Sequence, residues 1–223
     1  MKFSNDTVNI LKNFSLINPN LSFKSGNVLT TMSPQKSILA RAETQDSFPG
    51  SAAIYELPRF LGVLSLFNQP QVHFGEHQFT IEDDQKSVNY TYAEPSMILA
   101  PSKESIDIVP DVELDIDFEQ ITQLLRASNV MQLPEVAISG DDNICLEALN
   151  SKDSTSDTFR LKIKSNDTNR KFKFIFKTEN LKLMNFGYNV QITSRGLAKF
   201  TSINQTGPKV TYWIAVETNS EYV

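Results

Sequence analysis

Residues 5–17, NDTVNILKNFSLI, are the stretch that decides how this chain folds. On a helical wheel its apolar side chains fill one half, and asparagines and a lysine fill the other. Ser4 stands in the N-cap position, and Asp6 lies in the first turn, where the helix dipole favours an acid. The segment is therefore predicted to be an amphipathic helix with this apolar stripe: Val8, Ile10, Leu11, Phe14 and Ile17.

A matching amphipathic segment follows about 114 residues later, at 117–128, with Asp117 as its cap. Each half then continues with a strand, a shorter second helix and further alternating strands. The predicted second helices are residues 56–67 and 179–185, and the strands are 51–55, 72–74, 79–82, 87–93, 172–176, 189–193, 198–203 and 210–216. This repetition indicates an internal duplication. The alternative is one irregular α+β domain whose repeat is coincidental.

Between the two halves runs a segment, about residues 95–112, that contains three prolines together with serine, lysine and glutamate. Such a composition is typical of an extended connector. We therefore expect an α+β protein made of two domains, residues 1–108 and 109–223, with the connector between them.

The composition is that of an ordinary globular protein, with 40% hydrophobic and 21% charged residues and a net charge of −5. The chain has neither a secretory signal behind Met1 nor an apolar run long enough to span a membrane, so we expect a soluble, non-secreted protein. Its single cysteine, Cys145, rules out an internal disulfide and fits a reducing cytosol.

No catalytic constellation is present in the sequence, so we expect no enzymatic activity, no cofactor and no metal. His73 and His77 flank a turn-like Gly-Glu pair but lack a third metal ligand. The phosphate-binding, dinucleotide and nucleophile-elbow motifs are all missing. A hydrolase that uses Asp141, Asp142 and a divalent metal is a minor alternative, because this acid pair is more typical of a hairpin turn.

Each predicted helix carries one cation: Lys12, Arg59, Arg126 and Lys182. Such cations most often mark a solvated helix face. The charge pattern alone therefore decides nothing about function.

Several short stretches together are characteristic: Lys12–Phe14, Ile17–Asn18, Lys24–Gly26, Phe60–Leu66 and Gln123–Ser128. They resemble the sliding clamps of T4-like bacteriophages, which are processivity factors of DNA polymerase. The resemblance runs along the whole chain and is weakest between Asn150 and Asn169. It implies a DNA-clamp fold: two topologically similar domains, each with two helices packed on antiparallel sheet, assembling as a homotrimer into a closed ring.

The resemblance also implies partners. They are double-stranded DNA held without sequence preference, the C-terminal peptide of the phage DNA polymerase, the clamp-loader complex and late-transcription factors. The protein would work in the cytoplasm of the infected bacterial host, away from membranes. A β-rich structural or virion assembly protein is the alternative function.

The resemblance assigns site residues as well. Lys12 and Arg126 lie within matched motifs and would face DNA; Arg59, Lys182 and Lys2 join them by position. The partner-peptide pocket would be formed by the connector and the C-terminal strand, namely Met97, Ile98, Leu99, Ile106, Ile108, Val109, Tyr212, Ile214 and Val216. The connector is more charged between Ser102 and Asp107 than the family leads us to expect, which leaves the limits of this pocket open.

Overall fold

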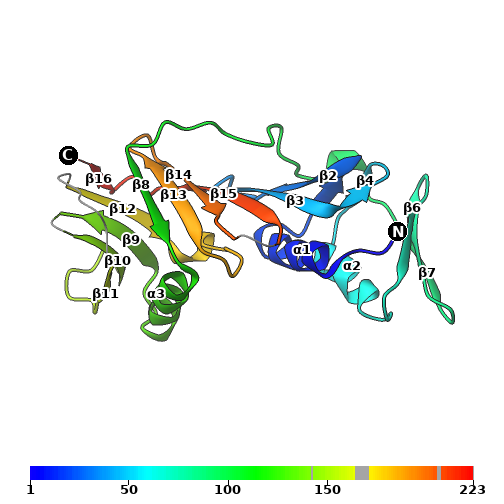
Figure 1. Ribbon diagram of the computed structural model, residues 1–223, viewed down its shortest axis with the longest axis horizontal. Coiled ribbons are helices and arrows are strands. Elements are labelled where there is room, and N and C mark those ends of the chain that lie inside the picture. Colours follow the sequence, from blue (N-terminus) through cyan, green and yellow to red (C-terminus); the bar gives the residue numbers. More distant parts are fainter. Residues whose placement is uncertain (142, 164–170, 205–206, 223) are drawn as a thin grey trace. The chain divides into compact units, whose positions relative to one another are not determined.

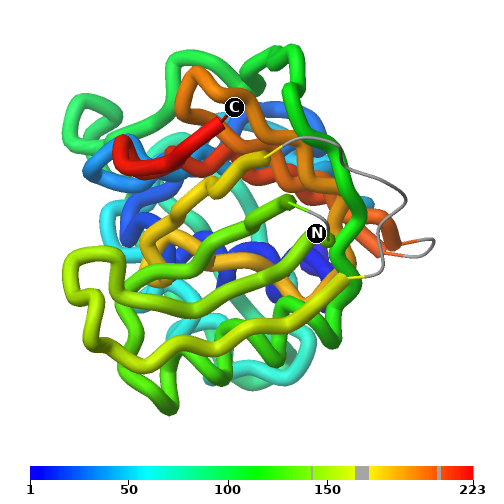
Figure 2. Tube along the Cα trace, turned by 90° about the vertical axis from the view of Figure 1, so that its left-hand side faces the viewer, coloured from blue at the N-terminus to red at the C-terminus, as the bar shows by residue number. Residues whose placement is uncertain are grey.

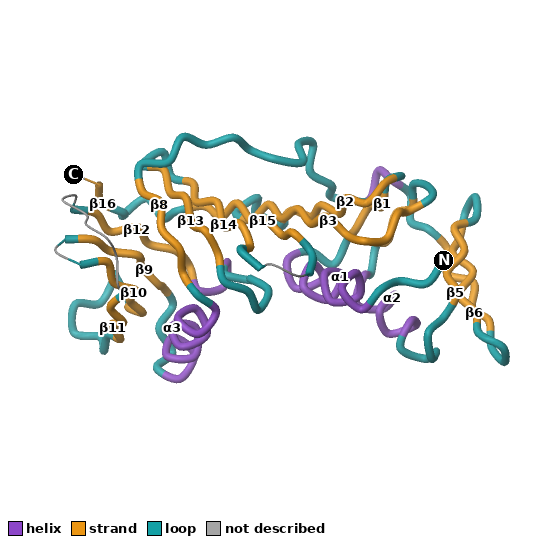
Figure 3. Tube along the Cα trace, viewed as in Figure 1, coloured by secondary structure: helices purple, strands orange, loops and turns teal. Residues whose placement is uncertain are grey.

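The computed structural model describes residues 1–141, 143–163, 171–204 and 207–222. The chain divides into two compact units (Figure 1). The first unit contains residues 1–106 and 207–211. The second unit contains the described residues of 107–204 and 212–222. Each unit combines helix with antiparallel strands, which confirms the α+β class (Figure 3).

In the first unit, helices α1 (Asn5–Ile17) and α2 (Leu57–Leu64) lie beside antiparallel strand pairs. The strands are β1 (Leu21–Phe23), β2 (Gly26–Met32), β3 (Ile38–Phe48), β4 (Ala52–Ile54), β5 (Gln71–Phe74), β6 (Gln78–Glu82) and β7 (Ser87–Thr91). β1 pairs with β4, β2 pairs with β3, and β5, β6 and β7 form a three-stranded sheet.

Helix α1 confirms the prediction from the opening stretch. The hydroxyl of Ser4 accepts a hydrogen bond from the Thr7 backbone N–H at 3.2 Å, which satisfies one of the free donors at the helix start. The side chains of Ile10, Leu11 and Phe14 have no exposed surface. Ile17 is buried as well, and Asn5, Asn9 and Lys12 on the opposite face are exposed. Two residues differ from the prediction: Val8 is only half-buried, and Asn13, which the wheel places on the polar half, is buried.

In the second unit, helix α3 (Phe118–Val130) begins with a capping box. The carboxylate of Asp117 accepts from the Gln120 N–H at 2.9 Å, and the Gln120 amide oxygen accepts from the Asp117 N–H at 3.1 Å. This reciprocal pair fixes the start of the helix where the sequence predicts it.

The strands of the second unit form two antiparallel arrangements. One has the order β11 (Phe159–Lys162), β10 (Ile144–Leu149), β9 (Glu135–Gly140), β12 (Phe172–Lys177) and β16 (Glu221–Tyr222). The other runs from β15 (Lys209–Ala215) through β14 (Leu197–Ser202) and β13 (Tyr188–Thr193) to β8 (Val112–Ile116). Figure 2 shows β9, β10, β11 and β12 of the first arrangement side by side, in green to yellow, whereas β16 is red.

The predicted helix at 179–185 is wrong. Only a single 3-10 turn, Thr178–Asn180, forms there, and the chain then runs on without helix. Leu181 and Leu183 both line the apolar space beneath α3, together with Leu124. Two apolar residues at i and i+2 suit an extended chain, whereas a helix would turn them to different faces.

Backbone groups in this segment are also used by the tyrosines of neighbouring strands. The Tyr188 hydroxyl donates to the Met184 carbonyl at 2.8 Å, and the Met184 N–H donates to the Tyr212 hydroxyl at 3.3 Å. These bonds replace those that a helix would have made.

In the first unit, α2 is also shorter than the predicted 56–67. In the described residues no helix has the length and apolar character to cross a bilayer.

Candidate functional site

The candidate DNA-facing cations of the first unit lie on or next to its two helices. Lys12 is exposed on α1, opposite the buried stripe, and Lys2 is exposed just before that helix. Arg59 is exposed on α2, where its guanidinium pairs with Glu56 at 3.4 Å. An ion pair with side chains 73% and 56% exposed is weak, so Arg59 can exchange Glu56 for a phosphate at little cost.

The candidates of the second unit occupy different settings. Arg126 is exposed on α3, on the side away from the buried Ile121 and Leu124. Lys182 is half-buried and follows the 3-10 turn, so it is not part of a helix as the sequence predicts. The predicted pattern of one cation on each helix is therefore confirmed for α1, α2 and α3. It is wrong for Lys182, because no helix forms there.

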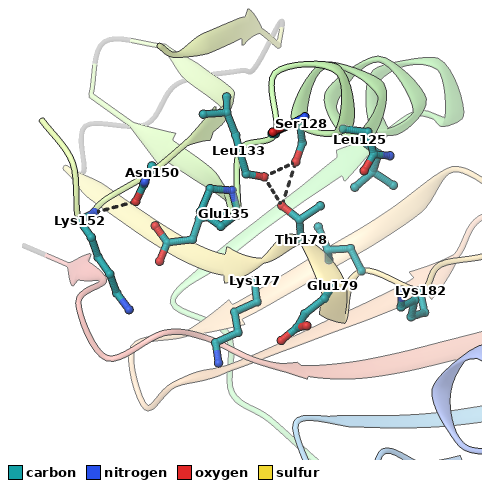
Figure 4. A pocket seen from close by; sticks show the side chains of 14 residues that line it. Leu125, Ser128, Leu133, Glu135, Asn150, Lys152, Lys177, Thr178, Glu179 and Lys182 are labelled. Carbon is teal, nitrogen blue, oxygen red and sulfur yellow. Dashed lines mark hydrogen bonds between the residues drawn. The ribbon is translucent and has the colours of Figure 1, made fainter. Parts of the chain in front are cut away.

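Lys182 lies in the wall of a pocket of about 770 Å³ in the second unit (Figure 4). The pocket is lined by the end of α3, the start of β9, the loop after β10 and the 3-10 turn. It collects three cations and two acids: Lys152, Lys177, Lys182, Glu135 and Glu179. Lys152 and Lys177 are not among the predicted DNA-facing cations, because that prediction takes one cation from each predicted helix and neither lysine belongs to one.

Hydrogen bonds hold the wall of this pocket together (Figure 4). The Ser128 hydroxyl donates to the Leu133 carbonyl at 2.7 Å and lies 3.0 Å from the Thr178 hydroxyl. The buried Glu135 carboxylate accepts from the Ser151 N–H at 2.8 Å. The end of α3 is thus fastened to the segment that leads into β9 and to the turn that carries Glu179.

The connector presents apolar side chains to solvent at several places. Met97, in a 3-10 turn (Pro95–Met97), is 58% exposed, and Val109 is 87% exposed. Ile98, Leu99, Ile106 and Ile108 are each half-buried. Met97, Ile98, Leu99 and Ile106 belong to the first unit, while Ile108 and Val109 belong to the second.

The candidates on β15 and after it are placed differently, because Tyr212 and Ile214 have no exposed surface and Val216 is buried. Burial raises the pKa of the Tyr212 hydroxyl above its ordinary value. Burial likewise raises the pKa of Tyr188, whose ring lies 6.0 Å from that of Tyr212. Tyr212 and Ile214 are therefore core side chains, with no surface to offer a peptide in this conformation.

A charged cluster lies on the five-stranded arrangement of the second unit. Glu147 accepts from the Ser139 hydroxyl at 2.6 Å and from the Lys173 ammonium at 2.9 Å, with the Arg160 guanidinium at 3.6 Å. Burial by itself raises the pKa of Glu147, but these donors and cations outweigh it, so the pKa lies below its ordinary value. This carboxylate is held ionised and serves as an acceptor.

Within the described residues no group of three or more His, Cys, Asp or Glu side chains could hold a metal ion. His73 lies 3.2 Å from Glu82, and His77 lies 3.7 Å from Glu76, all on the three-stranded sheet or its turn. Cys145 is buried in β10. The minor hydrolase alternative uses Asp141 and Asp142, and Asp142 lies outside the described residues.

Two family models match the chain, one in each half. The model described as DNA polymerase processivity factor matches residues 4–100, and the one described as gp45 sliding clamp, C terminal, matches residues 113–218. The chain is 30% identical to the sliding clamp of Enterobacteria phage T4 over 231 residues, covering 100% of this chain and 99% of that protein. It is 28% identical to the sliding clamp of Vibrio phage KVP40 over 224 residues, covering 97% and 99%.

The fold resembles that of clamps from cellular organisms. The chain superposes on the PCNA of A. fulgidus with a TM-score of 0.72, covering 96% of each chain at 12% identity. At this identity the match shows the fold alone, and that fold is the DNA clamp. Together with the full-length similarity to the phage proteins, it shows that this chain belongs to the sliding clamp family of T4-like bacteriophages, the processivity factors of DNA polymerase.

Proposed function

We propose that this protein is a homotrimeric ring that encircles duplex DNA and tethers the phage replicative polymerase to it. The observation that carries this proposal is the similarity to phage sliding clamps over the whole chain, matched in each half by a clamp family model. The protein would act in the cytoplasm of the infected host, by enclosure, without a cofactor and without chemistry of its own.

The proposed hold on DNA is weak in each contact. Lys12 on α1 and Arg126 on α3 are exposed, each on the helix face that points away from the buried apolar side chains. We propose that these two residues face the DNA phosphates, together with Arg59, Lys182 and Lys2. Phosphate contacts carry no sequence information, and a few of them allow a protein to slide along the duplex. The net charge of −5 supports this picture, since it limits binding of DNA anywhere else.

We propose that residues 1–108 and 109–223 are the two clamp domains, joined by the connector at 95–112. Partners would dock on the connector, where Met97, Ile98, Leu99, Ile106, Ile108 and Val109 offer apolar surface. The A. fulgidus PCNA structure holds the C-terminal region of FEN-1, which supports docking of a C-terminal peptide. The partners would be the polymerase, the clamp loader and, for phage late transcription, the transcription factors.

The first test is of the assembly itself. In solution the protein is expected to have three times the 25.1 kDa mass of one chain, and to stimulate its polymerase only after loading by the clamp loader. Mass photometry or light scattering measures the first property, and primer extension measures the second. Open-ended assembly with no effect on the polymerase would instead favour a structural or virion protein.

The DNA-facing assignment has its own test, the double variant Lys12→Ala with Arg126→Ala. Each removed phosphate contact lowers the attraction, so residence on DNA should shorten on the order of tenfold while the trimer stays intact. Single-molecule residence times on primed linear DNA, from whose ends an enclosing ring can slide, report the first outcome. Solution mass reports the second. The matched control is Lys162→Ala with Lys209→Ala, both exposed on strands, which should leave residence unchanged. Loss of the trimer without an effect on DNA would reject the assignment.

A further inference from the structure

The start of the connector is bonded to the rest of the first unit through its backbone. The Ala93 N–H donates to the Ala53 carbonyl at 2.9 Å, and the 3-10 turn Pro95–Met97 follows. From Ile98 to Ile106 the chain makes neither helix nor strand. Side chains from elsewhere that bond to the backbone of such a segment help to fix its path.

Asn18 supplies such a bond from the end of helix α1. Its side-chain amide donates to the Met32 carbonyl at 2.8 Å and to the Leu99 carbonyl at 3.2 Å. Its amide oxygen accepts from the Asn20 N–H at 2.9 Å. One side chain therefore joins α1, β2 and the connector, with both N–H groups and the oxygen in use.

The burial of Asn18 makes this junction strong. The residue is only 1% exposed, so water cannot replace a donor that is removed. The connector is also tied to the body of this unit by the ion pair of Lys24 with Glu104 at 3.3 Å. Its side chains are 58% and 47% exposed, and exposed pairs of this kind contribute little.

We propose that Asn18 is a positioning residue that fixes the connector against the end of α1. It bonds the connector at Leu99, directly after the exposed Met97 and the half-buried Ile98, and so sets how these apolar side chains are presented. The consequence for a docking peptide rests on the function proposed above. The effect on the connector itself does not.

The amides of Met97 and Ile98 provide a local reporter, because they donate within the 3-10 turn to Glu94 and Pro95. In full-length Asn18→Ala and Asn18→Asp at neutral pH, hydrogen exchange at these two amides should become about tenfold faster or more, because the bond to the Leu99 carbonyl is lost. The affinity of a synthetic peptide of the phage polymerase C terminus should fall in parallel.

Asn20→Ala is the matched control. It removes another amide-to-carbonyl bond, from Asn20 to Tyr55 at 2.7 Å, but leaves the backbone N–H that Asn18 uses. Exchange at Met97 and Ile98 should stay at the wild-type rate. A general loosening of this region would instead accelerate exchange in both the Asn18 and the Asn20 variants, and that outcome would overturn the proposal.

The Asn18→Asp variant adds a readout that depends on pH. An ionised carboxylate would face two carbonyl oxygens, whereas a protonated one can donate to one of them. Protection of Met97 and Ile98, corrected for intrinsic exchange rates, should therefore partly return as the pH is lowered in Asn18→Asp but not in Asn18→Ala. A purely steric role for Asn18 predicts no such difference.

The outcomes separate this inference from the proposed function. Wild-type exchange at Met97 and Ile98 in both Asn18 variants would reject Asn18 as the positioning residue. If the wild-type protein bound no polymerase peptide, the proposed function would fail while the exchange data still decided the role of Asn18. Should Asn18→Ala fail to fold, the nearly isosteric Asn18→Asp carries the same test.

Discussion

At the scale of single residues, a partly buried carboxylate is stabilised by the donors and cations around it. Glu147 is the clearest case, because its side chain is only 16% exposed and three groups donate to it or pair with it. Removing one partner from such a cluster leaves buried polar groups unsatisfied, which costs more than an exposed pair would.

Glu147→Gln should lower the free energy of unfolding by about 1.5–3 kcal/mol at pH 7, the range for hydrogen bonds to charged groups. The pKa of Glu147 in the folded protein lies below its unfolded value. Its contribution is therefore complete above the unfolded pKa and is lost as the pH falls through the folded pKa. Urea unfolding at fixed protein concentration should show a smaller difference between variant and wild type at pH 3 than at pH 7.

The control for this prediction is Glu113→Gln. Glu113 is exposed and accepts from the Gln191 amide at 3.1 Å, so its loss should stay within about 0.5 kcal/mol at both pH values. An equal loss for Glu147→Gln at pH 3 and pH 7 would mean that its charge contributes nothing.

At the scale of elements, caps and periodicity explain where the helices begin. Helix α3 carries a complete capping box, and α1 carries a serine cap. The second unit also shows the limit of local rules, since residues 178–185 have a helix-like composition but make only one 3-10 turn. There the packing of Leu181 and Leu183 under α3 decides the outcome.

Asp117→Ala should destabilise the protein by about 1 kcal/mol, because it removes the acceptor for the Gln120 N–H. Glu119→Ala is the matched comparison: Glu119 lies in the same first turn but makes no cap, so only its smaller interaction with the helix dipole is lost. Thermal unfolding of both variants and of Asp117→Ser distinguishes the two effects. Serine can also cap and should recover most of the loss. Equal losses for Asp117→Ala and Glu119→Ala would contradict the capping role.

At the scale of the whole molecule, the proposed ring holds DNA by topology more than by attraction. Loaded clamps should stay on a nicked circle but leave a linear duplex by sliding off its ends. On the circle, raising the salt from 50 to 200 mM should shorten the lifetime far less than the roughly thousandfold loss expected of a protein that relies on six or more phosphate contacts. Fluorescence of a labelled clamp on both DNA forms measures this. Equal lifetimes of the clamp on the nicked circle and on the linear duplex would exclude a ring that encircles DNA.

The sequence by itself determined the features that depend on near neighbours, namely the helices α1 and α3 with their caps and the strands β4 to β7 and β12 to β15. Short motifs along the chain also indicated the family. Periodicity and capping involve residues within four positions of each other, so they can be read from a single chain.

Only the tertiary structure decided the burial of Tyr212 and Ile214, the replacement of the fourth helix by a turn, and the bond from Asn18 to Leu99. Each depends on a partner far away in the chain, such as Leu99, which lies 81 residues after Asn18. Both faces of a strand can read as apolar, and an amide can bond any carbonyl within reach. The packing of distant segments selects among these choices, and no local pattern records it.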